Sequence, residues 1–162
     1  MSRSTFSGPI KSGTNRYAPY KNTGTTVLSQ TLPLAFDATL VQNATFYIPA
    51  GSQILNAWVD VTTGYNSATS ATLSIGKTSG GTEYASGVNA KTTGRTTPTF
   101  TTTQLTNMLS TPVDVSSQTT GNNGACSAVI ATVTSVGQPT AGATQVTIQY
   151  IQSDDRSAYS AQ

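Results

Sequence analysis

The chain has 162 residues, enough for one domain with a hydrophobic core of its own. Only 9% of the residues are charged, so Thr, Ser, Asn and Gln must supply most of the polar surface. The sequence contains no His, which removes the usual general base and the commonest metal ligand. This composition argues against an enzyme, and we expect no catalytic residues, cofactor or metal.

The first 24 residues differ from the rest of the chain in charge. They hold four of the eight Lys and Arg residues and no acid, and the first carboxylate is that of Asp37. Gly and Pro interrupt any regular pattern, so this stretch is not expected to fold alone. We interpret residues 1–24 as an extended basic arm that binds an anionic surface, with a solvated tail as the alternative. The residues expected to make this contact are Arg3, Phe6, Lys11, Arg16, Tyr17, Tyr20 and Lys21.

From residue 25 onward, short apolar or alternating segments are separated by turn residues. The alternation predicts strands near residues 26–34, 38–48, 53–62, 70–76, 97–102, 111–116, 125–136 and 143–152. One short helix is predicted within "TTTQLTNMLS", where a Thr N-cap precedes Leu105, Met108 and Leu109. Longer loops are expected at residues 63–69, 77–96 and 117–124.

The segment "QILNAWVDV" indicates how one strand divides between core and surface. Period two places Leu55, Ala57, Val59 and Val61 on one face, and Trp58 on the other. We expect a second layer or a neighbouring chain to cover Trp58, although an exposed binding role remains open.

Eight short strands and one short helix predict an all-β domain over residues 25–162. An antiparallel β-sandwich or a small barrel fits this spacing, and the strand order within it is not visible from the sequence. The single Cys126 lies in an apolar run, where a buried, inert thiol is expected. The opening residues lack the apolar core of a signal peptide, and no segment has the roughly 20 apolar residues that span a bilayer. We therefore expect no membrane partner.

Nucleic-acid binding is the obvious reading of a basic arm, because its bases and aromatic rings suit phosphates and unstacked bases. Residues 31–162, however, hold four bases and six acids and so add no basic surplus. A nucleic-acid-binding domain would normally show a basic face. We therefore expect no nucleic-acid partner.

Several segments, taken in order, resemble virion proteins of tailed bacteriophages, and more narrowly their small capsid decoration (cement) proteins. These segments are "STFSGPIKSGT", "IPAGSQILNAWVDVTTGYN", "SATLSIGKTSGGTEYASG", "TTGR" and "TAGATQVTIQYI". The likeness covers most of the chain and rests on the texture and order of the segments, without a catalytic or metal motif.

This resemblance implies an antiparallel β-sandwich, most often a jelly roll, with an immunoglobulin-like sandwich as the alternative. It also implies a homotrimer on the outer capsid surface of a virion that is assembled in the host cytoplasm. The partner would be the major capsid protein, whose subunits the trimer bridges and stabilises. The arm would lie across neighbouring capsid subunits, with its bases on acidic surface and its aromatic rings in shallow apolar pockets.

A different function is a receptor- or glycan-binding module of a tail or head fibre. Its binding residues would be aromatic and amide side chains in loops, of which Tyr65, Asn66 and Tyr84 are the candidates. Binding of glycan by the β-domain alone would distinguish this function from that of a decoration protein.

Overall fold

The computed structural model describes residues 27–49, 51–109, 111 and 126–151. These residues form eight strands and one helix. In chain order the elements are β1 (Val27–Ala35), β2 (Val41–Pro49), β3 (Gln53–Thr63), β4 (Ser70–Gly76), β5 (Ala85–Asn89), β6 (Gly94–Thr96), α1 (Thr102–Met108), β7 (Cys126–Val136) and β8 (Ala143–Ile151). The arm predicted at residues 1–24 lies outside the described residues.

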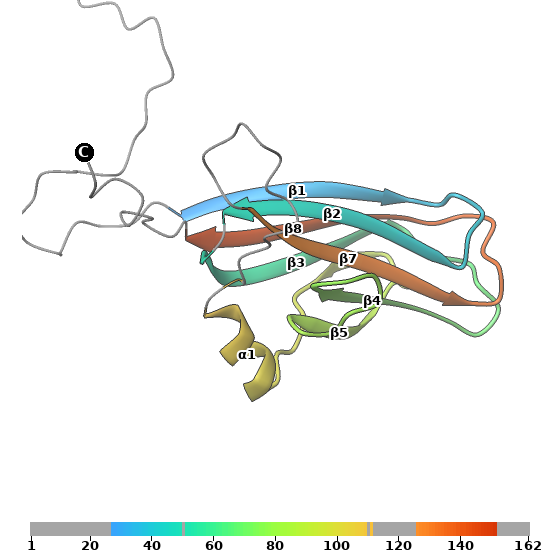
Figure 1. Cartoon of the computed structure of the whole chain (residues 1–162). Helices are drawn as coiled ribbons and strands as arrows, with labels where there is room; N and C mark the ends of the chain where they lie inside the picture. Colours follow the sequence, from blue (N-terminus) through green and yellow to red (C-terminus); the bar gives the residue numbers. More distant parts are fainter. Residues whose placement is uncertain (1–26, 50, 110, 112–125, 152–162) are drawn as a thin grey trace, which may run out of the picture.

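The strands form two antiparallel four-stranded sheets that pack face to face as a β-sandwich (Figure 1). The first sheet has the order β1-β8-β3-β6 and the second has the order β2-β7-β4-β5. Only β4 and β5 follow each other within one sheet, and every other step from strand to strand changes sheet. This crossing favours a jelly roll over the immunoglobulin-like alternative, in which more consecutive strands share a sheet; the jelly roll stays a prediction.

The core lies between the inward faces of the two sheets, where alternate side chains of each strand meet. Phe46 of β2 is opposite Val129 of β7, and Val59 of β3 is opposite Val146 of β8. All four side chains are fully buried. The alternation that predicted these strands therefore also selects the core, because successive side chains of a strand point to opposite faces.

The structure corrects the predicted strand at residues 97–102. Residues 97–101 connect β6 to α1, and residue 102 begins the helix. Strand β5, which pairs with β4, and strand β6, which pairs with β3, lie within the stretch expected to be a loop, residues 77–96. Both strands are short, and Gly87 and Gly94 have positive φ angles, so neither shows the alternation of a regular strand. The strand predicted at residues 111–116 lies outside the described residues except for Thr111.

The predicted inward face of β3 is right at three of its four positions. Ala57, Val59 and Val61 are buried, but Leu55 is 38% exposed and Ile54 takes its place in the core. The register between β3 and β8 shifts between Ile54 and Asn56. Such a β-bulge adds one residue and reverses the alternation on its far side, which explains the error.

Two further predictions concern single residues. Trp58 lies on the outer face of the first sheet opposite Thr147, and it is partly exposed. Cys126 is half-buried at the start of β7, so its thiol is less enclosed than expected. No helix among the described residues is long and apolar enough to cross a membrane.

Candidate functional site

The residues expected to bind a partner, Arg3, Phe6, Lys11, Arg16, Tyr17, Tyr20 and Lys21, lie outside the described residues. The structure nevertheless places the point at which their segment joins the domain. Val27, the first residue of β1, is opposite Ile151, the last residue of β8, and Ile151 is also opposite Gln53 at the start of β3. The segments before residue 27 and after residue 151 therefore join the sandwich at the same end.

Thr111 brings the helical segment to this end as well. Its backbone nitrogen donates to the oxygen of Ser52 at 2.8 Å, and its own oxygen accepts from the nitrogen of Gly51 at 3.0 Å. Gly51 has a φ of 75°, a conformation that glycine adopts without steric cost. We call this end of the sandwich, formed by Val27, Ile151, residues 51–53 and Thr111, the arm end. It lies on the left in Figure 1.

The helix α1 is fixed at its start and along its inner side. Thr101 caps it in a capping box, in which the Thr101 hydroxyl accepts from the Gln104 nitrogen and the Gln104 side chain accepts from the Thr101 nitrogen at 2.9 Å. The Gln104 amide nitrogen donates to the oxygen of Thr82 at 3.0 Å and to the Ser86 hydroxyl at 3.2 Å. Met108 is buried in the core cluster. The helix therefore has little freedom to rotate about its own axis.

A neighbouring face of the helical segment carries two exposed apolar side chains. Leu105 and Leu109 are four residues apart, a spacing that places them on one face, and they are 51% and 61% exposed. The sequence predicted the helix and named both leucines, but it gave no indication that they face away from the core.

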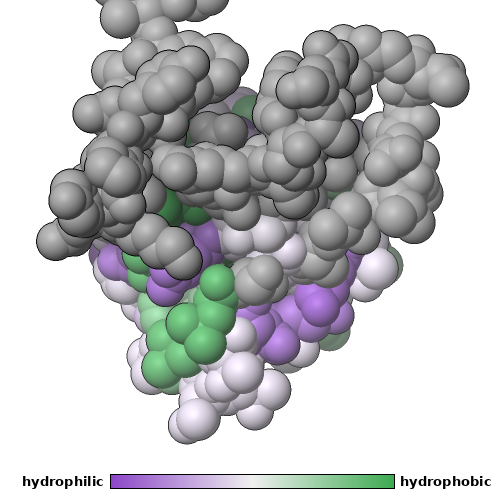
Figure 2. Space-filling model, turned by 60° about the vertical axis from the view of Figure 1, so that its left-hand side comes forward, coloured by the Kyte–Doolittle hydropathy of each residue, from purple (hydrophilic) through white to green (hydrophobic). Residues whose placement is uncertain are grey.

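Three more exposed apolar side chains lie on the strands near the arm end. Val27 and Leu28 begin β1, and Leu55 lies at the β3 bulge. We call these three residues together with Leu105 and Leu109 the apolar rim. Figure 2 brings this end forward and shows a small apolar patch that borders both hydrophilic and weakly polar residues. Large apolar side chains that are exposed at one end of a domain can serve as contacts for another protein.

Charge is sparse on the described surface, and none of it belongs to the apolar rim. The described residues hold three acids and three bases, which are Asp37, Asp60, Glu83, Lys77, Lys91 and Arg95. Asp60 accepts from Arg95 at 2.6 Å and 2.9 Å. These hydrogen bonds lower the pKa of Asp60 and raise that of Arg95. The described surface therefore carries no acidic surplus that could attract the four bases of the arm.

Two of the three loop residues proposed for glycan binding are not available to a ligand. Tyr65 and Tyr84 are both buried, with burial raising the pKa of each, that of Tyr84 to about 12. The side-chain oxygen of Asn66 accepts from the nitrogens of Thr140 and Ala141 at 2.7 Å and 3.0 Å. Its amide nitrogen donates to the Thr140 hydroxyl at 2.8 Å. The two tyrosines therefore offer no surface to a ligand, whereas Asn66 is exposed and its side chain holds the neighbouring loop in place.

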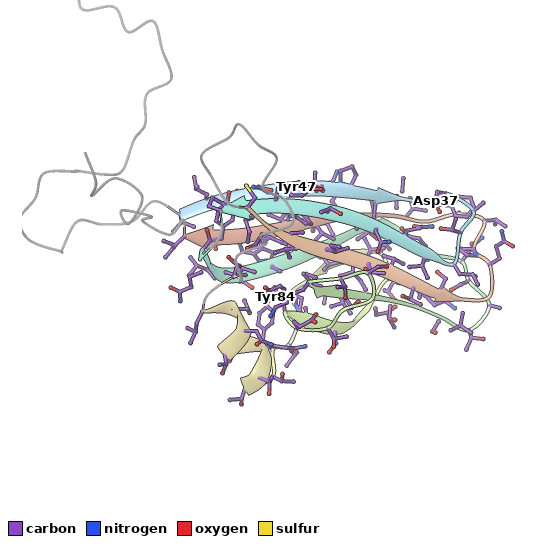
Figure 3. The ribbon with its side chains drawn as sticks, in the orientation of Figure 1. Asp37, Tyr47 and Tyr84 are labelled. Atoms are coloured by element: carbon purple, nitrogen blue, oxygen red, sulfur yellow. The ribbon has the colours of Figure 1, made fainter. Side chains whose placement is uncertain are left out.

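Figure 3 shows the labelled side chains at three separate places. Asp37 lies at the end of β1 away from the arm end, Tyr47 on β2, and Tyr84 between the helix and the sheets. Among the described residues, no three His, Cys, Asp or Glu side chains gather in a way that could hold a metal ion.

No protein-family model matches the chain, and no curated protein sequence matches it. A solved structure that is similar to it is a chain of the capsid asymmetric unit of cyanophage Pam1. The match covers 91% of this chain and all of that chain, with a TM-score of 0.52 and 20% sequence identity. Agreement of this kind over nearly the whole length, at such low identity, shows a shared fold.

Proposed function

We propose that this chain is a virion structural protein of a tailed bacteriophage, a decoration protein that binds the outer capsid surface and holds major capsid protein subunits together. The observation that supports this most strongly is the shared fold with a chain of a cyanophage capsid, which extends over the full length of that chain. The basic arm and the nearly uncharged domain agree with the proposal.

In this function the protein stabilises the shell by binding to it and catalyses no reaction. The arm contacts acidic capsid surface, and its aromatic rings occupy apolar pockets between subunits. A homotrimer presents three arms at once, so the second and third contacts form at high effective concentration. Because the protein binds the assembled shell and not its separated subunits, it stabilises the shell by mass action.

The number of copies in purified particles tests the proposal. A decoration protein is expected in a near-integer ratio to the major capsid protein, which quantitative mass spectrometry of particles measures. A handful of copies for each particle would place the chain in a tail or fibre, and its absence from particles would refute a virion role.

Deletion of residues 1–24 tests the arm. We expect the shortened chain to keep its far-ultraviolet circular dichroism spectrum and its cooperative thermal unfolding. It should no longer co-sediment with capsid shells that were prepared without the wild-type protein. A matched control replaces Arg3, Lys11, Arg16 and Lys21 by Gln at full length, which removes only the charge. If the shortened chain binds shells as tightly as the wild type, the arm does not anchor the protein. The virion role would then be tested by the copy number alone.

A further inference from the structure

We propose that the apolar rim, and Leu105 and Leu109 above all, is a second capsid-binding surface, through which the folded domain itself rests on the shell. This inference rests on the proposed function. It adds a contact that belongs to the sandwich and not to the arm, and it fixes which end of the sandwich faces the capsid.

The number of residues between the arm and the domain limits how the sandwich can be oriented on the shell. Lys21 precedes Val27 by six residues, which span at most about 20 Å even when fully extended. The nine-residue strand β1 is about 30 Å long, so the far end of the sandwich lies well beyond this reach. If Lys21 contacts the shell, the arm end must lie close to it, and this end carries the apolar rim.

The position of α1 is fixed by its own hydrogen bonds. The capping box and the bonds of Gln104 fix the inner side of α1, so Leu105 and Leu109 are held in place before any partner binds. A rigid apolar anchor loses little conformational entropy when it is buried, which makes it an efficient contact. The rim has no charged side chain, so it fits an apolar area of the capsid protein, whereas the arm requires an acidic one.

The test compares two double variants of the full chain for binding to purified shells that lack it. The first is Leu105→Gln with Leu109→Gln, because Gln is polar and keeps good helix propensity. The matched control is Leu40→Gln with Val136→Thr, which changes two similarly exposed side chains at the far end of the sandwich. Sedimentation at a series of concentrations gives the affinity, and light scattering gives the oligomeric state.

We expect the rim variant to bind shells at least about tenfold more weakly than the wild type, and the control to bind like the wild type. Equal binding by the rim variant and the wild type would overturn the rim proposal and leave the proposed function intact. A change of oligomeric state in the rim variant would also overturn it, since the rim would then join copies of this chain. Failure of the wild type itself to bind shells contradicts the proposed function, and the rim proposal with it.

A second variant tests the rim proposal if the double variant of Leu105 and Leu109 does not fold. If the double variant fails to unfold cooperatively, the single variant Leu109→Gln replaces it. Leu109 lies at the C-cap and is 61% exposed, so this change removes apolar surface without altering the helix interior. The same comparison with the far-end control then applies, with a smaller expected loss of affinity.

Discussion

Replacement of Tyr65 by Phe removes a buried hydroxyl at the far end of the sandwich. This hydroxyl connects the segment after β3 to strands β1 and β2. The Tyr65 hydroxyl lies 2.8 Å from the side-chain oxygen of Gln42 in β2 and 3.2 Å from the backbone oxygen of Leu34 in β1. It has one proton, so it donates to one of these oxygens at a time, and the shorter distance favours Gln42. Phe retains the ring, which packs so closely on Gly142 that a Cβ there would lie 2.4 Å from it.

The loss of stability depends on the Gln42 side-chain oxygen, which the substitution leaves without its donor. Tyr65 is 1% exposed and Gln42 is 4% exposed, so water cannot easily replace the lost donor. An acceptor left unpaired in such a place costs about 1–3 kcal/mol of unfolding free energy. In a chain of this size, each kcal/mol lowers the Tm by about 2–4 °C.

A double-mutant cycle separates the hydrogen bond from the packing. Urea unfolding of the wild type, Tyr65→Phe, Gln42→Leu and the double variant gives four free energies. Because the double variant removes both partners and leaves apolar groups of similar shape, it should be more stable than the sum of the single changes predicts. Additive single changes, or a loss below about 0.5 kcal/mol in Tyr65→Phe, would show that this bond contributes little.

Three further substitutions test the same domain. The Tyr84 hydroxyl is buried with no hydrogen-bond partner among the described residues, so Tyr84→Phe should leave the unfolding free energy at pH 7 unchanged or raise it by up to about 1 kcal/mol. Burial, with a smaller effect of the Glu83 charge, raises the pKa of Tyr84 to about 12, so the unfolded chain loses this proton first. Through this group the wild type should therefore lose about 2 kcal/mol between pH 10 and pH 12. Urea unfolding at each pH should show a smaller loss in Tyr84→Phe, and an equal loss would contradict the assignment. Arg95→Gln should raise the pKa of Asp60 toward its ordinary value in an NMR titration, while the Tm stays nearly constant because Arg95 is largely exposed. Phe46→Ala should cost about 3–5 kcal/mol in urea unfolding, since Phe46 is fully buried between the sheets; a loss below 1 kcal/mol would mean that the core collapses around the gap.

Regular alternation made most of the sandwich predictable. Strands β2, β4, β7 and β8 occur close to the predicted positions because each must bury one face, and period two displays that face in the sequence. The helix was predictable from a local signal, since Thr101 and Gln104 cap it through contacts only three residues apart. Strands β5 and β6 were missed because short segments with glycine form strands only when a neighbouring strand pairs with them.

The candidate site divides in the same way. The sequence alone indicated a basic arm and an almost uncharged domain, because charge and composition are carried by the residues themselves. It could not show that Leu105 and Leu109 face outward, that Tyr65 and Tyr84 face inward, or that Val27 and Ile151 lie side by side. The pairing of Val27 with Ile151 joins segments more than 100 residues apart, and the side chains of Tyr65 and Tyr84 are buried by contacts between separate segments, so only the folded chain shows these facts. The sequence by itself therefore determined the fold class and the basic charge of residues 1–24, and the tertiary structure decided at which end of the sandwich Val27 lies and which apolar side chains are exposed there.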